Sequence, residues 1–176
     1  MTWRDEIARR VRGQVLLDAP LAPRTAVRVG GPADLLVRPA DPDALGELLR
    51  AVRELGVPLA VLGGGANTLV ADAGVRGVVL KLPQDYPGES VEGERLVLSA
   101  GAPTSRLPAR AHAHGLTGME FIAGIPGTLG GAVAMNAGTR IGEMQDVVTR
   151  VELATADGTG FVPAETLGFG YRTCRL

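Results

Sequence analysis

Two glycine-rich loops hold the residues best suited to chemistry, and each contains one of the chain's two asparagines. The first loop runs from Gly63 to Thr68 and includes Asn67, and the second runs from Gly118 to Gly142 and includes Asn136. Glycine lets the backbone turn sharply or lie close to a ligand. Backbone N–H groups in such loops bind phosphate, and an asparagine amide can donate and accept hydrogen bonds there. We therefore treat both loops as candidate ligand sites, with tightly packed turns as the alternative.

The second loop carries no charged side chain between Glu120 and Arg140, a length that could span a bilayer. Its glycines and Pro126 argue against a membrane segment, and no basic flank fixes an orientation. The glycine spacing differs from the dinucleotide fingerprint G-x-G-x-x-G, and the first loop lacks the end of a Walker motif. We expect Thr128 to cap a short helix over residues 129–135, whose N-terminus would attract phosphate. Composition alone leaves phosphate binding and close packing equally open.

The composition is that of a globular protein with one domain or two small subdomains. The 176 residues are 45% hydrophobic and carry a formal net charge of −1, which favours neither a nucleic-acid nor an anionic-membrane partner. The N-terminus lacks the apolar core of a signal peptide. The lone Cys174 cannot form an intramolecular disulfide, so we expect a cytoplasmic protein. His112 and His114 point to different faces of an expected helix, which argues against a metal site.

Hydrophobic periodicity and turn signals predict an α+β fold. The expected helices cover residues 3–12, 41–56, 104–115 and a short segment after Pro163, with caps at Thr2 and Asp41 for the first two. A turn at Asp157-Gly158 is expected to reverse the chain between the last two strands. The expected strands cover residues 27–29, 34–38, 59–62, 78–80, 96–98, 147–155 and 160–162, of which 59–62 is apolar throughout and expected to be buried. We expect residues 1–20 to form an N-terminal helix and linker, followed by two subdomains at residues 21–85 and 90–176.

Four motifs in order resemble the UDP-N-acetylenolpyruvoylglucosamine reductase family, flavoproteins of bacterial cell-wall synthesis. They are Val61-Leu-Gly-Gly-Gly-Ala-Asn-Thr-Leu-Val70, the segment from Gly118 to Ala132, Met135-Asn-Ala-Gly138 and Tyr171-Arg172. The opening Thr25-Ala-Val-Arg-Val-Gly-Gly-Pro-Ala33 matches as well. The resemblance covers nearly the whole chain from Thr25 onward. Other flavoproteins of the vanillyl-alcohol-oxidase type share the glycine loops, so the ordered set carries the resemblance rather than any single motif.

The resemblance implies a two-subdomain FAD-binding fold of the vanillyl-alcohol-oxidase/PCMH type, with the flavin between the halves. It implies that the first loop binds the FAD pyrophosphate and that the second lines the flavin ring. The implied FAD contacts are Leu62, Gly63, Gly64, Gly65, Ala66, Asn67, Thr68, Gly101, Ala102, Gly124, Ile125, Gly127, Thr128, Gly130, Gly131, Asn136, Ala137 and Gly138. Tyr171 and Arg172 are implied to bind substrate, with Arg172 as the catalytic residue that stabilises negative charge.

The implied reaction is the reduction of UDP-N-acetylenolpyruvoylglucosamine to UDP-N-acetylmuramate, with FAD as cofactor and NADPH as co-substrate. We expect a monomer without metal, nucleic-acid or membrane partners. The sequence departs from the family pattern at residues 139–142, and we expect that the C-terminal substrate domain is missing and the isolated fragment is inactive. Another flavin oxidoreductase of this fold and a catalytically silent FAD-binding module are the alternatives.

Overall fold

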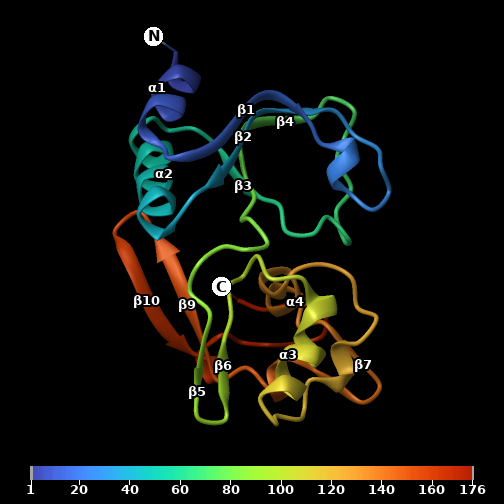
Figure 1. The fold of residues 1–176 in the computed structure, drawn as a ribbon. Coiled ribbons are helices and arrows are strands. Elements are labelled where there is room, and N and C mark those ends of the chain that lie inside the picture. Colours follow the sequence, from blue (N-terminus) through green and yellow to red (C-terminus); the bar gives the residue numbers. More distant parts are fainter. Residues whose placement is uncertain (1, 176) are drawn as a thin grey trace.

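A four-stranded sheet forms the centre of the first half of the chain (Figure 1). The structure, a computed structural model, describes residues 2–175. The strands, in their order across the sheet, are β1 (Gly13–Pro20), β2 (Pro32–Pro39), β4 (Val75–Leu80) and β3 (Leu59–Val61). Strand β1 is antiparallel to β2, whereas β2, β4 and β3 are parallel. The segments that follow β3 and β4 therefore leave the same edge of the sheet, an edge at which open α/β sheets commonly bind ligands.

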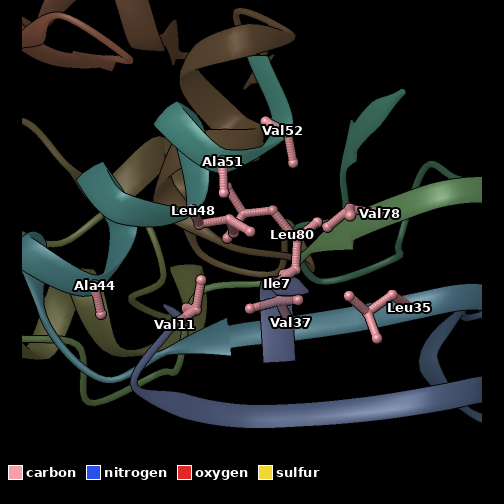
Figure 2. Packing of buried hydrophobic residues seen from close by; sticks show 10 residues of the cluster. All are labelled: Ile7, Val11, Leu35, Val37, Ala44, Leu48, Ala51, Val52, Val78 and Leu80. Carbon is pink, nitrogen blue, oxygen red and sulfur yellow. The ribbon is translucent and has the colours of Figure 1, made fainter. Parts of the chain in front are cut away.

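Strand β2 is buried on both faces, and its side chains alternate between two hydrophobic clusters. Leu35 and Val37 pack against helices α1 (Trp3–Arg10) and α2 (Pro42–Glu54), as Figure 2 shows. Leu36 packs on the opposite face in a cluster with Leu62 and Val70, which lie in the segment that follows β3. Burying a leucine or valine stabilises the fold by about 1.5–3 kcal/mol. The two clusters thus fix the sheet between helices on one face and loops on the other.

Both helices of the first half begin at a side-chain cap, as the sequence predicts. In α2, the Asp41 carboxylate accepts a hydrogen bond from the Ala44 N–H at 2.8 Å, and Pro42 occupies the first helical position. In α1, the Thr2 hydroxyl accepts from the Asp5 N–H at 3.3 Å, and the Asp5 carboxylate accepts from the Thr2 N–H at 2.8 Å. These caps satisfy N–H groups that have no partner within the helix.

The second half consists of short elements around a third hydrophobic cluster, which contains Leu107, Phe121, Ile122 and Met144. Its helices are α3 (Leu107–Ala113) and α4 (Leu129–Ala134), and its strand pairs are β5 (Ser90–Glu92) with β6 (Arg95–Val97), β7 (Gly138–Thr139) with β8 (Gly142–Glu143), and β9 (Arg150–Thr155) with β10 (Gly158–Pro163). The chain also forms 3-10 turns η1 (Ala22–Arg24), η2 (Thr104–Arg106), η3 (Glu120–Ile122), η4 (Met144–Asp146) and η5 (Ala164–Thr166).

The β9–β10 hairpin connects the two halves on one side of the molecule. Figure 1 shows β9 and β10 reaching up to the end of α2, and the Arg53 guanidinium on α2 lies 2.8 Å from the Asp157 carboxylate at the hairpin turn. This ion pair is exposed on both sides, so it contributes at most about 1 kcal/mol. The Arg53–Asp157 ion pair therefore shows where the two halves are in contact, but it adds little to the stability of that contact.

The structure corrects four expectations from the sequence. Residues 13–20, expected as part of a linker, form β1 and pair with β2 along its length. Asp18 and Pro20, which are unfavourable inside a sheet, are tolerated because β1 is an edge strand. Residues 27–29 form no strand, since Arg28 has a φ of +57°. Strand β3 is an edge strand rather than a buried one, with Val61 74% exposed. Strand β9 begins only at Arg150, because the N–H groups of Val147 and Val148 still donate to the Met144 carbonyl of η4.

Candidate functional site

The two glycine loops lie against each other at the junction of the two halves. A Cβ atom on Gly64 would lie 2.6 Å from the Gly127 Cα, and one on Gly63 would lie 2.7 Å from the Thr128 hydroxyl oxygen. Real Cβ atoms are not found this close to a backbone carbon, so Gly64 is required for the loops to meet. The structure therefore brings the two predicted loops together at Gly63–Gly64 and Gly127–Thr128.

The backbone N–H groups of Gly63, Gly64 and Gly65 have no acceptor among residues 2–175. Their loop is held through other groups: the Gly65 carbonyl accepts from the Ala26 N–H at 3.0 Å, and a Cβ on Gly65 would collide with the Arg24 carbonyl. Strand β3 carries the loop to the edge of the sheet, and Leu62 anchors it through a 2.8 Å bond to the Leu80 carbonyl. This loop can thus offer a group of N–H donors to an anion.

Two N–H groups at the start of α4, those of Leu129 and Gly130, are already used within the chain. Leu129 donates to the Ala102 carbonyl at 2.8 Å, and Gly130 donates to the Ala100 carbonyl at 2.9 Å. Thr128 stands at the N-cap position, but its side chain makes no capping bond. The sequence-based expectation of a phosphate-attracting helix N-terminus here is therefore not supported by this geometry. Gly101 and Ala102, two of the predicted FAD contacts, belong to the segment that satisfies these donors.

The glycines of the second loop divide into packed and open positions. Cβ atoms on Gly130 and Gly138 would collide with Ala100 and Glu143, so both glycines are explained by packing within the chain. Gly124 has a φ of +84° and no atom within 4 Å of the position of a Cβ. Similarly, the nearest atom to a Cβ on Gly131 would be the Thr128 hydroxyl at 3.5 Å. Open glycine backbone of this kind leaves room for the close approach of a flat ring.

The two predicted asparagines have different surroundings. Asn67 is exposed on the first loop, whereas Asn136 is only 2% exposed and has a φ of +41°. The Asn136 amide donates to the Gly170 carbonyl at 3.1 Å, and its oxygen accepts from the Gln145 N–H at 3.0 Å. Both ends of this side chain therefore tie the second loop to neighbouring parts of the chain, including the segment that precedes Tyr171.

Tyr171 and Arg172 form the tip of a tight turn. Gly170 and Thr173 exchange two backbone hydrogen bonds of 3.0 and 3.2 Å, and Arg172 has a φ of +57°. Tyr171 is 91% exposed, and the Arg172 guanidinium lies 5.9 Å from the centre of its ring. Among residues 2–175, Arg172 makes no salt bridge. The turn thus presents a guanidinium that is available to an anionic ligand.

Other residues near the turn offer little chemistry. The Cys174 thiol lies 3.6 Å from the Leu167 carbonyl, and burial raises the pKa of this thiol, which keeps it protonated and a poor nucleophile. Within residues 2–175, no group of three or more His, Cys, Asp and Glu side chains could hold a metal ion. No helix in that range has both the length and the apolar character needed to cross a bilayer.

Comparison with known proteins identifies the domain. The model of a family described as FAD binding domain matches residues 33–161. The chain belongs to this family. The UDP-N-acetylenolpyruvoylglucosamine reductase of Anaeromyxobacter dehalogenans (strain 2CP-1 / ATCC BAA-258) is 84% identical over 176 residues, which are 100% of this chain and 54% of the relative. That of Bacillus subtilis (strain 168) is 40% identical over 97% of this chain and 57% of its own length. The chain thus spans about half of these relatives.

Solved structures agree with the FAD binding domain assignment. The UDP-N-acetylenolpyruvylglucosamine reductase (MurB) from Thermus caldophilus has a TM-score of 0.75 and 37% identity, covering 94% of this chain and 57% of its own. A BBE-like 1 variant from Physcomitrella patens has a TM-score of 0.63 at 17% identity, covering 94% of this chain and 38% of its own, and shows the fold alone. The predicted resemblance to the reductase family and the predicted fold class are confirmed.

Sequence reasoning missed one group of residues at this site. Arg24, Arg28 and Lys81 line an open pocket of about 430 Å³ that borders Gly64 on the first loop. Arg24 and Arg28 come from the segment between β1 and β2, and Lys81 directly follows β4. Because Arg24 and Arg28 are far from Lys81 in the sequence, no motif indicates that the three side chains lie together. The one available signal was that Lys81 is the only lysine in the chain and ends a buried strand.

Proposed function

We propose that this chain is the flavin-binding part of a reductase that converts UDP-N-acetylenolpyruvoylglucosamine to UDP-N-acetylmuramate with NADPH. The observation that carries the proposal is the exposed Tyr171–Arg172 turn, which a hydrogen bond from Asn136 ties to the second glycine loop. The Arg172 guanidinium, which makes no salt bridge within residues 2–175, could bind the carboxylate of such a substrate. We further propose that the enzyme acts as a cytoplasmic monomer.

The proposed FAD contacts fall into two functional groups. The free N–H groups of Gly63, Gly64 and Gly65 suit the two phosphates of FAD, with Asn67 beside them. The open backbone at Gly124 and Gly131 suits the isoalloxazine ring, and Gly127 lies beside it where the two loops meet. The remaining predicted contacts, including Gly101, Ala102, Gly130, Ala137 and Gly138, would support the loops. When bound, FAD supplies the hydride chemistry.

Arg172 is proposed to stabilise the charge that develops on the substrate. Reduction of the enolpyruvyl double bond places negative charge next to the substrate carboxylate. A planar guanidinium can bind a carboxylate through two parallel hydrogen bonds, and such a fixed cation stabilises the transition state more than the ground state. Tyr171, next to Arg172 in the exposed turn, would contact the nucleotide substrate. The turn is tight, so its geometry is set before substrate binds.

The test is substrate-dependent reoxidation of the flavin. The protein that contains this chain is loaded with FAD, reduced anaerobically with NADPH and mixed with UDP-N-acetylenolpyruvoylglucosamine while flavin absorbance is recorded. We expect rapid reoxidation together with UDP-N-acetylmuramate, identified by mass spectrometry. A flavin that NADPH reduces but that only dissolved oxygen reoxidises would contradict the proposed substrate. A protein that takes up no FAD would contradict the proposed cofactor site as well.

A further inference from the structure

A positively charged pocket lies beside the first glycine loop, and the reaction proposed above assigns it no role. The pocket has a volume of about 430 Å³ and is open to solvent. Its lining residues are Pro23, Arg24, Thr25, Ala26, Arg28, Gly64 and Lys81. Three of these side chains are cations and none is a carboxylate. A concave surface lined by one sign of charge attracts ligands of the opposite sign.

These cations differ from most arginines of the first half, which are paired with carboxylates. Arg10 on α1, for example, lies 2.6 Å from Glu47 and 2.7 Å from Glu54 on α2. Within residues 2–175, neither Arg24, Arg28 nor Lys81 makes a salt bridge. The pocket therefore holds positive charges that no carboxylate within residues 2–175 neutralises. These cations repel one another, and a bound anion would offset that repulsion.

Lys81 connects the pocket with the glycine loop. It is half-buried at the carboxyl end of β4, and its ammonium group donates a hydrogen bond to the Gly63 carbonyl. Burial, followed by repulsion from Arg38 and Arg24, lowers the pKa of Lys81. Arg24 is held in turn by a 2.5 Å hydrogen bond to the Pro20 carbonyl. Lys81 and Arg24 are thus anchored on the protein in a pocket that Gly64 also lines, and the Gly64 N–H has no acceptor within residues 2–175.

We propose that Arg24, Arg28 and Lys81 form a binding site for a phosphate group of a nucleotide ligand. Phosphate is favoured over a carboxylate because three cations and the Gly64 N–H line the pocket, and a phosphate can accept hydrogen bonds on three or more oxygens. The group can come from the pyrophosphate of FAD or from the 2′-phosphate of NADPH. These two sources rest on the proposed function, but the anion site itself does not.

The first experiment probes the site without any nucleotide. Inorganic pyrophosphate is titrated into the flavin-free protein by calorimetry, using wild type, Lys81→Gln and Arg28→Gln. We expect each substitution to weaken binding by about tenfold, since each removes one charged hydrogen-bond donor from a partly exposed site. Lys81→Arg should bind nearly as wild type does, because it keeps the charge. Arg95→Gln, which removes an exposed cation from the β5–β6 hairpin, is the matched control and should have no effect.

The second experiment identifies the source of the phosphate. Dissociation constants of the same variants are measured for FAD, for riboflavin (which has no phosphate), for NADPH and for NADH. Weaker binding of FAD with unchanged riboflavin affinity assigns the site to the flavin pyrophosphate. Weaker binding of NADPH with unchanged NADH affinity assigns it to the 2′-phosphate. The proposal is wrong if both Gln variants bind pyrophosphate, FAD and NADPH as wild type does, or if wild type binds none of them. Failure of substrate turnover alone would count against the proposed reaction and leave this site intact.

Discussion

The two glycine loops are similar in sequence and different in the use of their backbone. In the first loop, the N–H groups of Gly63, Gly64 and Gly65 have no acceptor within residues 2–175. In the second, the N–H groups of Leu129 and Gly130 donate to carbonyls of the segment before α3. Glycine content therefore does not distinguish a phosphate cradle from a packed turn, whereas the hydrogen-bond partners of the loop do. We predict that the first loop acts on ligand affinity, and that the Tyr171–Arg172 turn attached to the second loop acts on catalysis.

The largest effect should follow from Arg172→Ala, on the side of the second loop. Because Arg172 is proposed to act on charge that develops in the substrate, its loss should slow flavin reoxidation by about 10²–10³-fold. The dissociation constant of FAD and the rate of flavin reduction by NADPH should stay close to wild type. Arg172→Lys should restore part of the rate, since lysine keeps the charge but lacks the planar fork. Stopped-flow measurement of both half-reactions checks this, and equal slowing of the two would make Arg172 a structural residue.

Gly64→Ala should disrupt the contact between the loops. The new Cβ would lie 2.6 Å from the Gly127 Cα, and neither backbone can yield easily. We expect a loss of about 3 kcal/mol in the free energy of unfolding, the upper end of the usual cost of overpacking. Urea denaturation followed by circular dichroism measures it.

Gly131→Ala provides the control for that substitution. Its Cβ would have no neighbour closer than 3.5 Å, and alanine is the better helix former, so stability should be unchanged or higher. If the ring of FAD lies against this open backbone, the affinity for FAD should fall even though stability does not. Equal destabilisation by both substitutions would contradict the division into packed and open glycines.

The sequence predicts correctly those helices and hairpins that are determined by neighbouring residues in the chain. The cap at Asp41, the helix that follows it and the β9–β10 hairpin at Asp157-Gly158 are confirmed because capping and turn chemistry act over a few residues. The sequence predicts a linker where β1 forms, because Asp18 and Pro20 disfavour a strand and the pairing with β2 is not visible in a single segment.

The same distinction between local and distant causes applies to the site. The glycine loops and the Tyr171–Arg172 turn could be located from motifs alone. The bond from Asn136 to Gly170 and the cluster of Arg24 with Lys81 join residues that are far apart in the chain. The bond and the cluster form only in the tertiary structure, so the sequence alone could not predict them.

Asn136→Ala tests whether the second loop holds the Tyr171–Arg172 turn. The substitution leaves the Gly170 carbonyl and the Gln145 N–H without their partners, which should cost about 2 kcal/mol at about 1 kcal/mol per hydrogen bond. Flavin reoxidation by substrate should slow, because Arg172 would no longer be held in place. Asn67→Ala is the control in the exposed first loop and should leave stability unchanged. Normal reoxidation in a folded Asn136→Ala protein would show that the turn keeps its position without this bond.

The smallest expected effect is on stability at alkaline pH, and it compares the chain's two tyrosines. One of them, Tyr86, is buried, and the other, Tyr171, lies in the exposed turn. Tyr86 lies in the connection between the halves, is 8% exposed, and has no hydrogen-bond partner for its hydroxyl among residues 2–175. Burial, followed by repulsion from Asp41 and Asp43, raises the pKa of Tyr86 to about 12 from an ordinary value of 10.0. A raised pKa means that the folded state favours the protonated phenol. The corresponding stability is complete below pH 10 and is lost as the pH rises toward about 12.

Tyr86→Phe should remove this alkaline loss, because the variant has no phenol to ionise. Near pH 7 it should be as stable as wild type or more stable by about 1 kcal/mol or less, since it removes a buried hydroxyl without a partner. Tyr171→Phe, at the 91% exposed turn, should follow the wild-type curve throughout. Melting temperatures measured between pH 8 and pH 12 compare the three proteins. Parallel curves for wild type and Tyr86→Phe above pH 10 would mean that other groups cause the alkaline loss, and that the buried tyrosine is not protected from ionisation in the folded state.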